Sequence, residues 1–148
     1  MINRGKNAAD IGTDHARLPV YLIKNQICKH VTASDLNDGP LEFAEKNIRI
    51  SGLGNITLLK SDGFSEYSKE LLEMTDEYII AGIGGELIVK ILDSAPEIKN
   101  IKNHFVLQPM TKIELLREYL KENGYRIEVE EQVKDKKHVY TVMSVYII

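Results

Sequence analysis

Cysteine is almost absent from this sequence, because Cys28 is the only one among 148 residues. A single cysteine excludes a disulfide within the chain and a cysteine-rich metal site. Long apolar runs are also missing, since none approaches the roughly 20 residues that span a membrane. The first six residues, MINRGK, contain no apolar core of the kind that a secretory signal carries. We therefore expect a cytoplasmic protein that holds no metal and spans no membrane.

An excess of positive charge is missing as well. The chain has 19 Lys and Arg against 22 Asp and Glu, a net charge of −3. Such a chain has no general attraction for polyanions, so binding to nucleic acid would need a local basic patch. One small cluster, Lys134, Lys136 and Lys137, is either a solvated turn or a phosphate-binding patch.

The rest of the composition is that of an ordinary globular protein. Hydrophobic residues make up 43% and charged residues 28% of the chain. The sequence has no repeat, no low-complexity tract and no long linker. We expect one domain over residues 1–148, long enough to bury a sizeable core.

Short apolar runs alternate with helical patterns along the chain. The apolar runs predict strands at 8–11, 31–34, 56–59, 78–81 and 104–107, and each is followed by a predicted helix, the third of which covers 65–74. The pattern then changes to two strand-like runs, 125–133 and 139–147. The gap between these runs is too short for a helical crossover, so the two strands must be antiparallel. We predict an α/β fold with a mostly parallel, seven-stranded sheet, an antiparallel C-terminal hairpin and helices on both faces.

The loop after the first predicted strand carries the most informative residues. It contains Asp10, Gly12, Thr13, Asp14 and His15, and a helical pattern follows at once. In a parallel α/β sheet a nucleotide-like ligand usually lies at this turn, where glycine lets the backbone approach it. Two carboxylates would repel a pyrophosphate, and one glycine stands where a dinucleotide fingerprint has three. The loop therefore suits a ligand with a nucleoside part and a cationic part, as in S-adenosylmethionine.

The next two strand ends supply further candidate ligand contacts. Asp35 ends the second strand, where an acid accepts hydrogen bonds from ribose hydroxyls, and Asn37 lies just beyond. The alternative for Asp35 is a turn or helix-capping role. Asp62 is placed to accept a hydrogen bond from an adenine amino group, and Gly63 would let the ring lie close. Ser-Asp-Gly is also a common turn string, so a turn is the alternative here.

Three residue groups have a wider range of roles. Asp10 either orients the first loop or meets the ligand's ammonium group, and a buried structural role is nearly as plausible. Asp14 and His15 are the candidates for contact with both ligand and substrate. At the end of the fourth strand, Ala81, Gly82 and Gly84 either leave room for a sulfonium or a flat base, or form a tight turn and a helix start.

Five strings in this order and spacing resemble one family. They are Asp10-Ile11-Gly12-Thr13-Asp14-His15-Ala16 with Leu18-Pro19, then Asp38-Gly39-Pro40, Asp62-Gly63, Ala81-Gly82-Ile83-Gly84-Gly85 and Leu107-Gln108-Pro109. Together they look like the bacterial tRNA (adenine(22)-N(1))-methyltransferases of the TrmK type. The resemblance covers the chain from about residue 8 to the last strand.

The resemblance implies a Rossmann-like class I methyltransferase fold. It also implies S-adenosylmethionine as donor and N1 of adenine 22 in tRNA as acceptor. The strand-end residues supply the candidate site for this chemistry. The candidate catalytic residues are Asp14 and His15, and the candidate donor site contains Asp10, Gly12, Thr13, Asp14, Asp35, Asn37, Asp62, Gly63, Ala81, Gly82 and Gly84. Members of the family are expected to have an extra helical segment before the first strand and a helical arm after the last one, and neither is present in this sequence.

Three alternatives stay open at this point. The first is a small-molecule methyltransferase on the same fold, which the acidic net charge favours. The second is a donor-binding remnant that does not act on tRNA. The third is a dinucleotide-binding domain, which the single glycine in the first loop disfavours.

Overall fold

The computed structural model describes residues 1–101 and 103–148 and divides the chain into two compact units, Ile2–Tyr78 and Ile79–Ile148. Each unit is described by itself. Within the described residues, no helix is long and apolar enough to cross a membrane.

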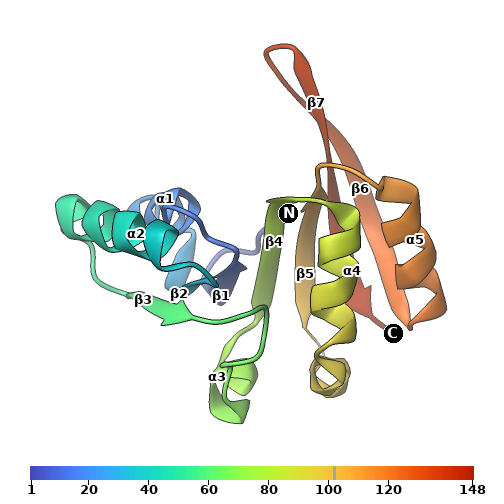
Figure 1. Ribbon diagram of the computed structural model, residues 1–148, viewed down its shortest axis with the longest axis horizontal. Helices are drawn as coiled ribbons and strands as arrows, with labels where there is room; N and C mark the ends of the chain where they lie inside the picture. The colour runs from blue at the N-terminus through green and yellow to red at the C-terminus, as the bar shows by residue number, and fades with distance from the viewer. Residues whose placement is uncertain (102) are drawn as a thin grey trace. The chain divides into compact units, whose positions relative to one another are not determined.

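The first unit is built on three parallel strands in the order β3-β2-β1. Its elements are β1 (Lys6–Ile11), α1 (Arg17–Lys24), β2 (Cys28–Asp35), α2 (Asp38–Ser51), β3 (Ile56–Lys60) and α3 (Lys69–Met74). Helices α1 and α2 lie side by side over the same face of these strands (Figure 1). Strands β1 and β2 begin earlier than their apolar runs. The added residues include the exposed or half-exposed Lys6 and Asn7 of β1 and Lys29 and His30 of β2, which an apolar pattern does not include.

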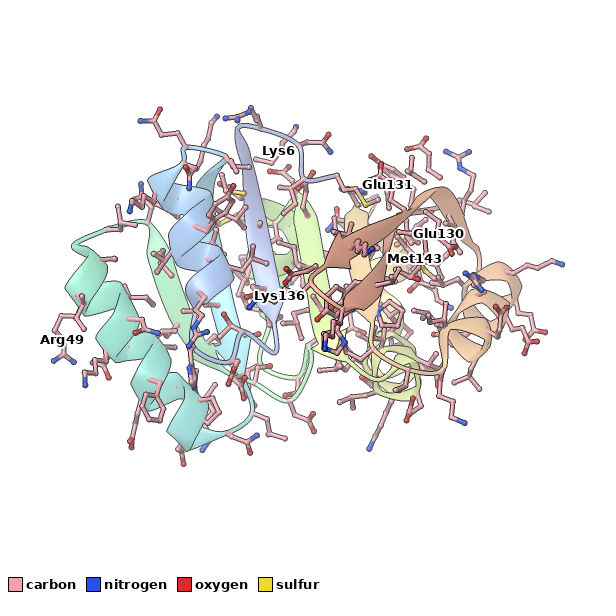
Figure 2. The ribbon with its side chains drawn as sticks, turned by 90° about the horizontal axis from the view of Figure 1, so that it is seen from above. Lys6, Arg49, Glu130, Glu131, Lys136 and Met143 are labelled. Carbon is pink, nitrogen blue, oxygen red and sulfur yellow. The ribbon has the colours of Figure 1, made fainter. Side chains whose placement is uncertain are left out.

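Small residues let α2 approach the strands closely. Ala16, Ala33 and Ala44 form a buried cluster, and three larger side chains of α2 and β3 pack against it. These are Ile48, Ile56 and Leu58. On the far side of α2, Arg49 points into solvent (Figure 2).

The prediction of a helix over 65–74 was wrong in its first half. Helix α3 covers only Lys69–Met74, because the Oγ of Ser68 accepts the backbone N–H of Leu71 and caps the helix there. The preceding segment is a loop in which Ser61 donates to the carbonyl of Gly63 and Ser65 accepts the N–H of Asp62. Serine side chains that bond to nearby backbone compete in this way with a helix.

The second unit has four strands in the order β4-β5-β7-β6. Its elements are β4 (Glu77–Ile83, which begins at the boundary), α4 (Gly85–Asp93), a short 3-10 helix η1 (Pro96–Asn100), β5 (His104–Pro109), α5 (Ile113–Glu122), β6 (Tyr125–Asp135) and β7 (His138–Ile147). Strand β7 runs antiparallel to both β5 and β6, which confirms the predicted C-terminal hairpin. The hairpin is long, and its tip at Lys136 reaches beyond α4 and α5 (Figures 1 and 2).

Strand β4 is longer than predicted. It continues to Ile83, so Gly82 lies on the strand and not in the turn after it. The turn itself is tight for a packing reason. A Cβ on Gly85 would lie 2.5 Å from the carbonyl oxygen of Lys112, at the start of α5. The glycine at this helix start is therefore required by close backbone packing.

Tyr125 gives a stability prediction. It is 3% exposed, and within the described part of the chain its hydroxyl has no hydrogen-bond partner. A buried unsatisfied hydroxyl costs roughly 1–3 kcal/mol. We expect Tyr125→Phe to raise the free energy of unfolding by about 1 kcal/mol in urea titrations. As a control, the same change at Tyr78, whose hydroxyl donates to the carbonyl of Leu72, is expected to lower it. A destabilised Tyr125→Phe variant would contradict the prediction.

Candidate functional site

The loop from β1 to α1 folds back over the end of β2. Gly12 has a φ of +76°, a left-handed conformation that glycine adopts without strain. The backbone N–H groups of Gly12 and Thr13 both donate to the carbonyl of Ser34, at 2.9 and 2.8 Å. A Cβ built on Gly12 would meet no described atom within 4 Å, so the space beside it is open. The loop is thus fixed at the carboxyl end of the sheet with room for a ligand next to its glycine.

Asp10 supports this loop from below. It is 5% exposed, and its Oδ2 accepts the hydroxyl of Thr13 at 2.8 Å. Burial raises the pKa of Asp10 to about 6; the hydrogen bond from Thr13 opposes this rise and the charge of Asp35 adds to it. Of the three roles predicted for Asp10, this contact and the burial support the orienting and the buried structural ones.

The raised pKa predicts that Asp10 destabilises the apo protein at neutral pH. The pKa of Asp10 is higher in the folded chain than its ordinary value of 3.8. The free energy of unfolding therefore falls as the pH rises from 3.8 through about 6. The shift corresponds to a cost on the order of 3 kcal/mol above that range. We expect Asp10→Asn, which retains an acceptor for Thr13, to unfold at higher urea than the parent at about pH 8. The advantage should shrink towards about pH 4, and a pH-independent difference would contradict the assignment.

Asp35 joins two backbone segments at the end of β2. Its Oδ2 accepts the N–H of Asp14 at 3.0 Å, and its Oδ1 accepts the N–H of Asn37 at 3.1 Å. Each carboxylate oxygen keeps a further lone pair for another donor. The carboxylate is therefore held in one orientation and remains part-exposed at the sheet edge. The turn role and the ligand role, treated as alternatives for the sequence, are compatible here.

The end of β3 lies directly beside Asp35. The N–H of Ser61 donates to the carbonyl of Asp35 at 3.0 Å, and Asp62 follows as an exposed residue. Gly63 has a φ of +55°, which a side-chain-bearing residue would adopt only with strain. The structure thus brings the ends of β1, β2 and β3 to one edge of the first unit, as the sequence predicted.

Asp14 and His15 project from the same loop. The Asp14 Oδ1 is 3.6 Å from the His15 Nε2, and the two side chains are 72% and 32% exposed. Asp14 and Ala16 both have a φ of +57°, although neither is a glycine. Such residues cost about 1–3 kcal/mol each and gather at functional sites. The backbone on both sides of His15 is therefore held in a strained conformation.

Three residues near this loop were not predicted from the sequence. Phe43 of α2 is 56% exposed, with its ring centroid 4.8 Å from that of His15. Asn47, one turn later, donates its Nδ2 to the carbonyl of His15 at 2.8 Å. Leu36 is 52% exposed and directly follows Asp35. A large apolar side chain next to a polar strand end was the available signal for Leu36.

The candidates after β4 belong to the second unit. The N–H of Gly82 donates to the Oε1 of Gln108 at 2.8 Å, so Gln108 joins the ends of β4 and β5. A Cβ on Gly82 would meet no described atom within 4 Å, whereas one on Gly84 would lie 2.9 Å from side-chain oxygens of Glu86 and Thr111. The ligand roles of Ala81, Gly82 and Gly84 stay predictions.

Among the described residues, no group of three or more histidine, cysteine, aspartate or glutamate side chains could hold a metal ion. The candidate ligand contacts described above are carboxylates and backbone groups at the strand ends. All of them lie at the carboxyl ends of parallel strands, where α/β sheets bind their ligands.

Comparison with known proteins identifies the family. The family described as "Methyltransferase domain" matches residues 1–143. The chain belongs to this methyltransferase domain family. The fold expected from the sequence, a Rossmann-like α/β arrangement with seven strands and a C-terminal hairpin, is the fold of this methyltransferase domain.

Among curated proteins, this methyltransferase domain is similar to the tRNA (adenine(22)-N(1))-methyltransferase of Bacillus subtilis (strain 168). The two are 32% identical over 143 residues, which are 96% of this chain and 59% of that protein. The chain spans about three fifths of the length of the curated relatives it matches.

Solved structures agree with the predicted resemblance. The B. subtilis M1A22 tRNA methyltransferase TrmK superposes with a TM-score of 0.91 at 31% identity, covering 99% of this chain and 62% of that one. The M. capricolum TrmK, in complex with S-adenosyl-homocysteine, superposes with a TM-score of 0.85 at 34% identity, covering 99% and 64%. The similarity to TrmK-type enzymes that the sequence motifs indicated is confirmed.

Proposed function

We propose that this chain binds S-adenosylmethionine at the ends of β1, β2 and β3 and transfers its methyl group to N1 of adenine 22 in tRNA. The observation that carries the proposal is the carboxylate of Asp35. It is fixed at the end of β2 by the loop that follows β1, in a chain that superposes over 99% of its length on a TrmK bound to S-adenosyl-homocysteine.

The residues of the first unit fit such a donor. Asp35 has free lone pairs for the two ribose hydroxyls, and the open space beside Gly12 admits the donor next to the backbone. Asp62 would accept a hydrogen bond from the adenine amino group, and Gly63 would leave room for the ring. Thr13 and Asn37 position the two loops, and Asp10 holds Thr13.

Methyl transfer needs positioning more than acid–base chemistry, because the sulfonium of the donor has already activated the methyl carbon. The C–S bond breaks as the bond to N1 forms, and its electron pair goes to sulfur. The adenine ring then carries a positive charge. Asp14, with a side chain 72% exposed beside His15, would stabilise this charge or accept a proton from N6.

A labelled-donor experiment tests the proposal. The chain is incubated with methyl-labelled S-adenosylmethionine and an unmodified tRNA transcript, and the control transcript carries guanine in place of adenine 22. We expect label in the first transcript only, recovered as 1-methyladenosine. A cytoplasmic site of action follows from such a substrate.

Two results would overturn the proposal in different ways. Equal labelling of both transcripts would reject the acceptor while retaining a tRNA methyltransferase. Donor binding by calorimetry without label in any tRNA would favour the donor-binding remnant, or, if a pool of small metabolites is labelled, the small-molecule enzyme. The net charge of −3 is the observation that keeps this last reading in the test.

A further inference from the structure

One phenylalanine of the first unit lies in the wrong place for a core residue. The chain has three phenylalanines, of which Phe64 and Phe105 are 3% and 0% exposed. Phe43 is 56% exposed on the second turn of α2. An aromatic ring that remains more than half in water contributes little to folding by burial. Its position needs another explanation.

The ring of Phe43 forms a pair with His15. Their centroids are 4.8 Å apart and their planes are inclined by 34°. His15 is held for this contact from two sides. Asn47, four residues after Phe43 and thus on the same face of α2, donates to the carbonyl of His15 at 2.8 Å. The left-handed backbone at Asp14 and Ala16 fixes the approach of the loop.

The ring pair is continuous with the proposed donor site. The Oδ1 of Asp14 is 3.6 Å from the Nε2 of His15, and the backbone N–H of Asp14 donates to the carboxylate of Asp35. One chain of contacts therefore runs from the ribose-binding acid through Asp14 to the two rings. An exposed carboxylate next to one of two paired rings suits a flat base with an exocyclic amino group, which would donate a hydrogen bond to the carboxylate.

We propose that His15 and Phe43 form the stacking surface for the acceptor base, and that Asp14 accepts a hydrogen bond from the amino group of this base. This inference rests on the proposed function, because it takes the acceptor to be an adenine displaced from its stack. Removal of an adenine from a base stack must be compensated by new stacking in the enzyme. Stacking on an aromatic side chain changes affinity by about tenfold to a hundredfold per base when the side chain is removed.

Phe43→Ala tests the ring, and Tyr21→Ala is the matched control. Tyr21 is an aromatic residue of α1 in the same unit with 57% exposure, nearly that of Phe43. We expect Phe43→Ala to lower kcat/KM for tRNA by about tenfold or more, without changing the Kd for S-adenosylmethionine or the Tm. Tyr21→Ala should behave as the parent, and Phe43→Tyr should restore the activity because it keeps a ring.

A binding experiment makes the result independent of turnover. A short single-stranded RNA with 2-aminopurine in place of one adenine is titrated with the chain in saturating S-adenosyl-homocysteine. Stacking quenches the probe, so we expect quenching by the parent, by Tyr21→Ala and by Phe43→Tyr, and much weaker quenching by Phe43→Ala.

The outcomes separate this inference from the proposed function. A parent that labels no tRNA rejects the proposed function, while quenching that depends on Phe43 still supports the ring pair. If the parent labels tRNA and Phe43→Ala has the same kcat/KM as the parent, the ring pair alone is overturned. An increased Kd for the donor in Phe43→Ala, with unchanged quenching, also overturns it, because the rings would then serve the donor.

Discussion

Replacement of Asp14 with alanine is expected to lower kcat for tRNA methylation by about a hundredfold or more while the Kd for S-adenosylmethionine changes less than about threefold. The reason is that the side chain of Asp14 is 72% exposed, while its contribution to the donor loop comes from its backbone N–H to Asp35. Loss of the carboxylate removes the charge opposite the methylated ring and leaves this N–H in place. Single-turnover assays and calorimetry measure the two quantities separately.

The backbone at Asp14 decides which controls are informative. Its φ of +57° is unfavourable for alanine, tolerated by asparagine and free of strain for glycine. If the charge is required, Asp14→Asn and Asp14→Gly should both be as inactive as Asp14→Ala. If the residue serves only the loop conformation, both should retain activity, and this result would contradict the catalytic role.

The sequence predicted the positions of the strand ends well because acidic residues and glycines mark them. Asp10 and Gly12 follow a buried apolar run, and Asp35 follows another, so their place at one sheet edge could be predicted from the parallel order alone. The hydrogen bonds that turn Asp35 into a link between two loops depend on the register of β1 and β2. No local pattern contains that register.

The misjudged segments share a cause in backbone competition. Residues 65–68 were predicted to be helical. The hydroxyls of Ser61, Ser65 and Ser68 instead form hydrogen bonds with nearby backbone, so the helix begins only at Lys69. Strand β4 continues through Gly82, because Gln108 accepts its N–H from the next strand. Both effects depend on hydrogen bonds between side chains and backbone, which a periodicity argument does not consider.

Phe43 was missed for a different reason. Phe43 directly precedes Ala44 in α2, and residue type alone does not show which of two apolar neighbours is buried. Only the structure shows that Ala44 is buried while its neighbour is in solvent. Exposure, and not residue type, shows that Phe43 is not a core residue.

Replacement of Asp35 with alanine should raise the Kd for S-adenosyl-homocysteine by about tenfold to a hundredfold, the effect of losing charge-assisted hydrogen bonds. The same change releases the N–H groups of Asp14 and Asn37, so weaker binding alone would not prove a ribose contact. A chemical cycle separates the two effects. The parent should bind the 2′-deoxy form of S-adenosyl-homocysteine less tightly than the ribose form, whereas Asp35→Ala should bind both with similar Kd. If the parent does not discriminate between the two ligands, or if Asp35→Ala retains the discrimination, Asp35 acts on the loops only.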